Sequence, residues 1–420
     1  MQVHSLAVLT LFAVVGCGEG AAVRTGSITS TGTALEPARR DSADMEILAF
    51  PENSRAMAPQ LSVVADPVTV IGDDEDGSDA IGFAHSALLL PDGSVVLWDD
   101  ARGQLVLFDA DGRQVRRVGQ RGQGPGDFGS VRELVLQGDS VLASDPDNSR
   151  VSIYSTELEL LGIETLPVDC RRESIVGRMP GGGYAGFSTG ILPWDLERAD
   201  TIQRQPEALL LIGGGRCDTL RSLPGMEVRT VEFKQRGRSL TQSVPVRFGR
   251  RPMVAVLGSK IATGTGDSYQ IDLRDETGAL HRRLAVEWAA SPSPPGARDT
   301  LLDQALARFE APGAERMIDR DASRQFTIDH TYVTDSLPAF HDLIVSTDSL
   351  LWVVEAWAPG LPEREATAFD LNGRMTAHLR MPSRFSPLGF GPGRVLVQTT
   401  EEETGLVLLE VLRIAPDSAH

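Results

Sequence analysis

Short apolar runs alternate with turn-forming residues through most of the chain, and this pattern returns about every 45 residues. In its clearest copy, residues 83–119, apolar runs of four or five residues are separated by PDG, DDARG and DADG, which are turn signals. Runs this short, joined by tight turns, predict hairpins, so each copy predicts a four-stranded antiparallel sheet. The recurrence favours one domain of repeated sheets over two unrelated domains.

Further copies of the pattern cover residues 128–166, 173–223, 251–286, 337–381 and 385–415. The last copy has only three strands, and QLSVVADPVTVIG at 60–72 resembles the outermost strand that it lacks. Pairing this strand with the last copy would close a ring without leaving an exposed edge. The sequence therefore predicts an all-β fold, a six-bladed β-propeller over residues 59–415 closed by an N-terminal strand. Trp98 and Trp352 occupy corresponding places in two copies, where they would pack between neighbouring blades.

Two stretches stand outside the repeat. Residues 287–336 open with a Pro-rich turn and continue into DTLLDQALARF, in which Leu302, Leu306 and Phe309 share one helical face. They predict a short helical insertion between blades four and five. Residues 187–207, inside blade three, are irregular. If either stretch were a further blade with a degenerate sequence pattern, the ring would have seven blades. A seven-bladed ring remains the alternative architecture.

The N-terminus has the pattern of an export signal. A polar start is followed by LAVLTLFAVVG at 6–16, which is too short to span a bilayer, and then by Cys17. The string VVGC resembles the lipobox of bacterial lipoproteins, in which cleavage before the cysteine leaves its thiol to carry lipid. We therefore expect residues 1–17 to be a lipoprotein signal peptide with Cys17 as the lipid attachment residue. Cleavage into a soluble exported protein is the alternative.

The segment after Cys17 predicts how the protein is attached. Residues 18–58 are rich in Ser, Thr, Gly, Ala and Pro without a hydrophobic period, so we expect a flexible tether. Gly18 resembles the pattern of lipoproteins that are passed on to the outer membrane. We expect an extracytoplasmic location, the periplasm or outer membrane in a cell with two membranes, with membrane contact through the lipid alone.

Two further cysteines, Cys170 and Cys217, would lie in a compartment where thiols tend to pair. A disulfide between them would stabilise the fold by about 4 kcal/mol in the chain-entropy model. Two separate buried thiols are the alternative.

The charge of the chain limits its partners. With 58 acidic and 40 basic residues, the net charge is -18. This charge repels phosphate backbones, and no Lys/Arg-rich run offsets the repulsion locally. We therefore exclude nucleic acid and expect a monomer that binds a protein partner or a small anionic ligand.

The second copy carries a more specific motif. A Gly-Pro-Gly-acidic-Phe segment is followed by an acidic-x-x-Asn-x-Arg-apolar turn, made by Gly124, Pro125, Gly126, Asp127 and Phe128 and then by Asp145, Asn148, Arg150 and Val151. In these features, residues 119–155 resemble the NHL-type repeat and its relatives among bacterial six-bladed propeller lipoproteins. The resemblance implies a scaffold for binding proteins or small ligands, and it implies no single activity.

No motif in the sequence specifies catalysis. GQGPG at 122–126 lacks the helix that a phosphate-cradling loop needs, because a strand pattern follows it. GFSTG at 186–190 has the spacing of a nucleophile elbow, but ILP follows instead of a helix. The acidic cluster DDEDGSD at 73–79 has no carboxylate at the first and last ligand places of an EF-hand. We therefore predict no catalytic residue and no cofactor.

The residues that directly precede the inner apolar runs are basic or can become so. They are His85, Arg132, Arg172, Arg251, His341 and Arg384. At equivalent places in six blades they would converge on one mouth of the central channel, where clustered arginines could bind a carboxylate or phosphate. We therefore predict an anionic-ligand site there. Two alternatives remain open: these arginines pair with acidic residues of adjacent blades, or His85 and His341 ligate a metal in a propeller hydrolase or lyase.

Overall fold

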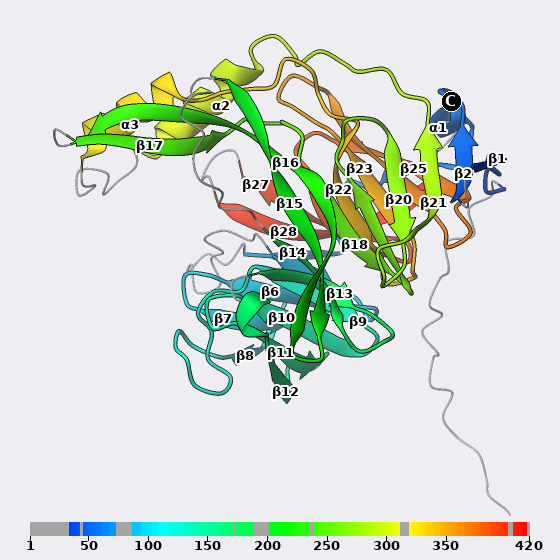
Figure 1. Cartoon of the computed structure of the whole chain (residues 1–420), viewed down its shortest axis with the longest axis horizontal. Coiled ribbons are helices and arrows are strands. Elements are labelled where there is room, and N and C mark those ends of the chain that lie inside the picture. Colours follow the sequence, from blue (N-terminus) through cyan, green and yellow to red (C-terminus); the bar gives the residue numbers. More distant parts are fainter. Residues whose placement is uncertain are drawn as a thin grey trace, which may run out of the picture.

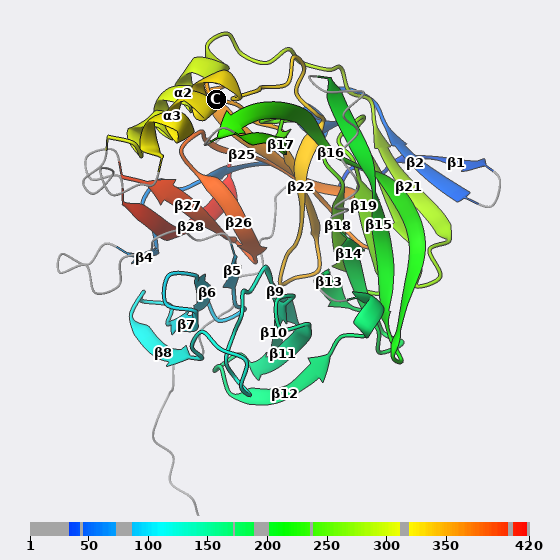
Figure 2. The same cartoon turned by 60° about the vertical axis from the view of Figure 1, so that its left-hand side comes forward.

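The structure, a computed structural model, describes residues 33–42, 45–72, 86–170, 173–188, 201–235, 238–310, 319–401 and 406–417. Six blades of mainly antiparallel strands follow one another around a central axis (Figure 2), so the six-bladed β-propeller is confirmed. Within the repeat, the innermost strand of each blade comes first and the later strands lie progressively outward, and strands from the N-terminal segment are added at the outer side of blades four, five and six. The predicted signal peptide, with Cys17, lies outside the described residues. None of the helices within the described ranges is long and apolar enough to span a membrane.

The strands of the first two blades follow the predicted spacing, whereas blade three is longer than predicted and has a fifth strand. Blade one contains β5 (Ala87–Leu89), β6 (Val95–Asp99), β7 (Gln104–Phe108) and β8 (Gln114–Val118). Blade two contains β9 (Glu133–Gln137), β10 (Ser140–Asp145), β11 (Arg150–Ser155) and β12 (Leu160–Thr165). Blade three contains β13 (Ser174–Arg178), β14 (Tyr184–Ser188), β15 (Ile202–Gly213), β16 (Arg216–Gln235) and β17 (Arg238–Pro245).

The remaining blades complete the ring. Blade four contains β18 (Met253–Leu257), β19 (Lys260–Gly264), β20 (Gln270–Arg274) and β21 (Leu280–Val286). Blade five contains β22 (Phe340–Val345), β23 (Leu351–Glu355), β24 (Glu363–Phe369) and β25 (Met375–Pro382). Blade six contributes only β26 (Ser386–Gly391), β27 (Arg394–Thr400) and β28 (Val407–Pro416) from its own stretch of chain.

An N-terminal strand closes the ring, as the sequence predicts. β4 (Thr69–Ile71) pairs antiparallel with β28 and supplies the fourth strand of blade six. β3 (Gln60–Val63) bridges two blades, because it pairs in parallel with β25 and antiparallel with the end of β28. The first and last parts of the propeller are therefore joined by backbone hydrogen bonds.

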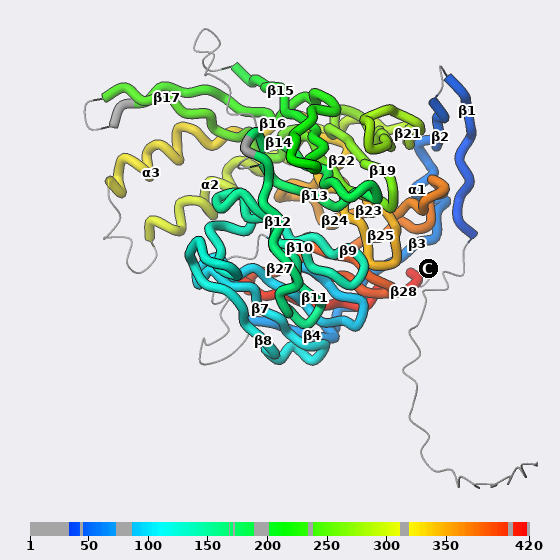
Figure 3. The backbone as a smooth tube through the Cα atoms, turned by 60° about the horizontal axis from the view of Figure 1, so that its bottom comes forward, coloured from blue at the N-terminus to red at the C-terminus, as the bar shows by residue number. Residues whose placement is uncertain are grey.

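The flexible tether predicted for residues 18–58 is wrong for its second half. β2 (Met45–Phe50) pairs in parallel with β21, β1 (Ala38–Ser42) folds back on β2, and the short helix α1 (Ser54–Met57) follows (Figure 3). Leu48 and Phe50 are fully buried in the core of blades four and five. Their alternation with half-buried neighbours is a strand pattern, so apolar burial fixes this segment to the propeller.

Aromatic side chains fill the spaces between blades. Trp98 of β6 lies edge-on to Phe128, with ring centroids 5.2 Å apart, in a cluster shared with blade two. Trp352 of β23 stacks on Phe390 of blade six at 4.4 Å. Both tryptophans are buried between neighbouring blades, as predicted.

The insertion between blades four and five is helical, as predicted, and consists of α2 (Ala297–Ala307) and α3 (Arg320–Asp329). The helices lie beside an arm that the sequence did not predict (Figure 1). In this arm β16 continues well past residue 223, the expected end of blade three, and pairs with β17. Phe233 of the arm contacts Phe326 of α3, with ring centroids 4.7 Å apart.

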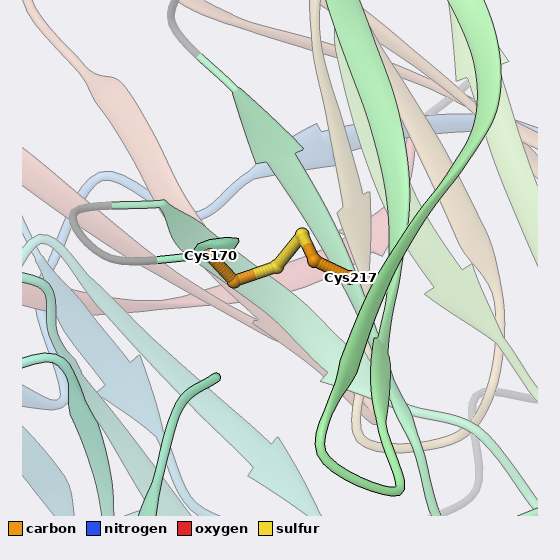
Figure 4. Close-up of a disulfide and its surroundings, with 2 residues drawn as sticks. All are labelled: Cys170 and Cys217. Carbon is orange, nitrogen blue, oxygen red and sulfur yellow. A yellow bond between two sulfur atoms is a disulfide. The ribbon is translucent and has the colours of Figure 1, made fainter. Parts of the chain in front are cut away.

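The disulfide left open by the sequence is present between Cys170 and Cys217 (Figure 4). It joins the 3₁₀ helix η1 (Val168–Cys170), which connects blades two and three, to β16. The cross-link spans a sequence separation of 47 residues, so it limits the freedom of the unfolded chain around blade three.

The NHL-like motif forms a structural clamp. The fully buried carboxylate of Asp145 accepts hydrogen bonds from the amides of Gly129 and Ser130 at 3.0 and 3.1 Å and from Asn148 Nδ2 at 2.7 Å. Arg150, with its Nε 3.8 Å from Asp145, donates to the carbonyl oxygen of Gly124 at 3.0 Å. The motif thus fastens the connector between blades one and two, and it needs no ligand to account for its residues.

Replacement of Asp145 by alanine should therefore destabilise the protein strongly. The change leaves Arg150 as a buried cation without its carboxylate, which costs about 3–5 kcal/mol. We expect the midpoint of urea denaturation, followed by circular dichroism, to fall markedly. The control is Asp111→Ala, whose carboxylate pairs with Arg113 at 3.0 Å but is 72% exposed, and it should change stability by less than about 0.5 kcal/mol. Equal losses of stability in the two variants would contradict the structural role proposed for Asp145.

Candidate functional site

The inner strands enclose a channel with a volume of about 400 Å³. Each blade contributes at least one branched apolar side chain to its wall. Among these residues are Leu88, Val135, Val176, Val254, Ile344 and Leu388. The alternation of an inner strand turns every second side chain toward the lumen, so the six strands place apolar side chains around the channel.

Charged residues lie at one end of this channel, where the inner strands begin. Glu133, Arg251 and Asp342 come from blades two, four and five, and all three line the cavity. Arg251 Nη2 donates to the carbonyl oxygen of His341 at 2.9 Å and lies 3.9 Å from Asp342 Oδ2. We call these three residues the mouth. A polar head group would meet charge there, while an apolar tail could enter the channel beneath.

Glu133 titrates near neutral pH. Its side chain is exposed within the channel, but the surrounding protein disfavours the charged carboxylate, and this desolvation, reinforced by the negative charge of Asp342, raises its pKa to about 7. The positive charges of Arg251 and Arg132 act in the opposite direction and offset only part of the shift. The mouth is therefore a mixture of both signs whose net charge changes around pH 7.

His341 supports the mouth without lining it. The register of β22 shifts between Phe340 and Asp342, which leaves His341 as an extra residue in the strand. Its Nδ1 lies 2.9 Å from the carbonyl oxygen of Glu355. Burial lowers the pKa of His341 to about 4, and the nearby Arg251 and Arg364 lower it further against the opposing effect of Asp342. The imidazole is consequently neutral at pH 7.

The remaining predicted residues lie around the mouth or outside the described part of the chain. Arg132 directly precedes β9 and is exposed, and it contributes positive charge near Glu133. Arg384 is exposed before β26, with its guanidinium 4.5 Å from the ring centroid of Phe385. His85 and Arg172 lie outside the described residues, as does the acidic cluster at 73–79.

The sequence missed the two acidic members of the mouth. Glu133 and Asp342 each follow a predicted basic residue by one position, and a shift of one residue turns a strand side chain to the other face. The bulge at His341 causes that shift in blade five. The polar Glu133 is followed by the apolar Leu134, and this strand alternation could have identified Glu133 as a residue that faces the channel. The predicted ring of positive charge is thus corrected to a mouth of mixed charge.

Two observations bear on the alternative chemistries. Within the described ranges, no group of three or more His, Cys, Asp and Glu side chains is arranged to hold a metal ion. Ser188, the middle residue of the elbow-like string, ends β14 and hydrogen-bonds the carboxylate of Glu173. Burial nevertheless raises the pKa of Glu173.

Comparison with known proteins concerns mainly the architecture. A family model described as a 6-bladed beta-propeller (DUF5128) matches residues 83–197, and comparison with the curated proteins gives no match. A Bacteroides fragilis protein that is named as exported has 14% identity and a TM-score of 0.46, with 88% of this chain and 99% of that chain covered.

Two further solved structures show a similarity of the same order in identity and TM-score. A DUF4221 family member from Bacteroides vulgatus has 10% identity and a TM-score of 0.47, covering 86% of this chain and 100% of its own. A gluconolactonase from Xanthomonas campestris has 10% identity and a TM-score of 0.37, covering 85% and 98%. The six sheets and the match over the first blades identify the chain as a six-bladed β-propeller.

Proposed function

We propose that this protein is an exported, lipid-anchored binding protein that takes a small amphiphilic carboxylate at the mouth of its channel. The observation that carries the proposal is the abrupt change of lining, from Glu133, Arg251 and Asp342 at the mouth to six apolar side chains beneath them. A cavity of about 400 Å³ accommodates the tail of a small molecule, and the charged groups orient its head.

The positive groups of the mouth favour a carboxylate head. Among the described residues, Arg251 directs Nε and Nη2 to one carbonyl oxygen, which leaves its Nη1 for a ligand oxygen. Asp342 is already near Arg251, so its charge is partly balanced. Arg132 is exposed and forms no ion pair with any residue in the described ranges. Protonated Glu133 can donate a hydrogen bond to the incoming carboxylate.

Replacing Arg251 with alanine should weaken binding of decanoate, the probe carboxylate, by about tenfold or more, since a hydrogen bond to a charged group contributes about 1.5–3 kcal/mol. Isothermal titration calorimetry at pH 6 measures the affinity. The matched control is Arg374→Ala, because Arg374 pairs with Asp370 in the β24–β25 turn at the opposite end of the blade. Unchanged affinity in the Arg251 variant would refute the proposed head-group contact.

Affinity for decanoate should fall as the pH rises through 7. Decanoate is ionised throughout this range, whereas Glu133, with its pKa of about 7, is mostly neutral at pH 6 and mostly charged at pH 8. The charged form repels the ligand, and an interaction that shifts the pKa by one unit corresponds to about a tenfold change in affinity. The Glu133→Gln variant should bind decanoate with nearly constant affinity between pH 6 and 8. A pH profile that survives this substitution would exclude Glu133 as its origin.

The lipid anchor can be tested separately. When the chain is expressed with its own signal in a Gram-negative host, it should partition with the membrane fraction and incorporate labelled palmitate. Cys17→Ser should abolish the incorporation and the partitioning. Export itself is supported by the Cys170–Cys217 disulfide, because disulfides persist outside the reducing cytoplasm. Incorporation of label by the Cys17→Ser variant would disprove the assignment of Cys17.

A further inference from the structure

The outermost strand of blade three, β17, has one free edge. β17 pairs antiparallel with β16 along one side. On its other side, no residue between Ser239 and Val244 forms a backbone hydrogen bond within the described ranges. Most of the strand is exposed, and its hairpin projects with α2 and α3 beyond the ring of blades (Figures 1 and 3). Such an edge offers its backbone groups to another strand.

The register shows which backbone groups face this edge. The amide of Val246, directly after β17, donates to the carbonyl oxygen of Glu227 of β16 at 2.9 Å, so it points toward β16. Along an antiparallel pair, residues that point toward the partner strand alternate with residues that point away from it. The register of the hairpin has no bulge, so Ser239, Thr241 and Ser243 direct their N–H and C=O groups to the free edge. A further strand would meet these three residues.

Two other outer strands carry features that discourage edge pairing. β8 contains Arg116 and Arg117, and β1 has the sequence ARRDS. Charged side chains along an edge hinder the approach of a second strand. β17 has no charged residue between Ser239 and Val244, in a chain whose net charge is -18. The edge of β17 is therefore left open to pairing.

We infer that β17 pairs antiparallel with β17 of a second copy of the chain, around a twofold axis at Thr241. The order Ser239, Thr241, Ser243 is the same in both directions, so the edge is complementary to itself. Thr241 would lie opposite Thr241 of the partner subunit, and Ser239 opposite Ser243 of the partner subunit. Each of these residues would exchange both backbone hydrogen bonds with the residue opposite.

The side chains are compatible with this pairing. Leu240 would lie across from Gln242 of the partner subunit, so no like charges meet along the strand. Contact of the same strand in both copies leaves no further edge to extend, and the assembly stops at a dimer. The inference goes beyond the proposed function. It departs from the monomer expected from the sequence, because composition and net charge do not reveal an unpaired edge.

The first test places a cysteine on the axis of the full chain, expressed with its own signal. In Thr241→Cys, two cysteines would lie opposite each other with Cα atoms about 5.5 Å apart, a separation that a disulfide spans. The native Cys170 and Cys217 do not compete, because they are already joined. Non-reducing electrophoresis should show most of the chain as a dimer. The control Asp111→Cys, at a side chain that is 72% exposed on blade one, should stay monomeric.

The second test changes the edge itself in a chain that carries Ser239→Cys and Ser243→Cys, which should also cross-link. Adding Thr241→Pro removes the central outward N–H without touching the bonds to β16, and should reduce the dimer about tenfold or more. Thr241→Val keeps the N–H and should leave the dimer unchanged. Thr241→Lys, which sets like charges opposite each other, should act as Thr241→Pro does. Circular dichroism verifies that each variant is folded.

Two results would overturn the inference: a Thr241→Cys dimer no more abundant than that of Asp111→Cys, or a dimer that survives both Thr241→Pro and Thr241→Lys. A cross-link from Thr241→Cys to a protein of different mass would overturn the second copy as the partner.

Discussion

The pairing of β4 with β28 is the contact on which the rest of the structure depends. A propeller blade has two edges, and an open ring would leave the last sheet with unpaired backbone groups. Three hydrogen-bonded residue pairs between the N-terminal and C-terminal parts of the chain remove that edge. With the ring closed, the six inner strands are held around one axis, and the side chains that begin them meet at one mouth. Without this closure, the sheets that carry Glu133, Arg251 and Asp342 would not be held around one axis.

The mouth illustrates how a protein with a large negative net charge can still have a local binding site for an anion. Arg251 bonds the carbonyl oxygen of His341 and is partly balanced by Asp342, whereas Glu133 loses its charge near neutral pH. The net charge of the whole chain says little about this place, because fields of exposed surface charges are screened within about 10 Å at ordinary salt. Local burial and the spacing of a few groups decide what the mouth attracts.

Much of the fold could be predicted from the sequence because its determinants are local. Tight turns between short apolar runs revealed the blades, and the missing strand of blade six revealed the closure through β4. The addition of β1 and β2 to blade four could not be read in this way. β1 is an exposed edge strand with the sequence ARRDS, so it has no apolar alternation, and the partner of β2 lies more than two hundred residues away.

The site was harder to predict than the fold. Identification of the inner strands sufficed to find Arg251, but the bulge in β22 placed Asp342 toward the lumen instead of His341. A sequence pattern reports which way a side chain points along one strand, whereas contacts between strands depend on register.

The N-terminal segment has a mechanical consequence. β2, β3 and β4 are consecutive in the chain but lie on blades four, five and six. A pulling force applied before residue 35 would first load the two backbone hydrogen bonds between Leu35 and Met375 of blade five, and would then peel β1 from β2 and act along the length of β2. The closing strand β4 would feel this force only after these attachments had failed, so it is shielded from tension at the N-terminus.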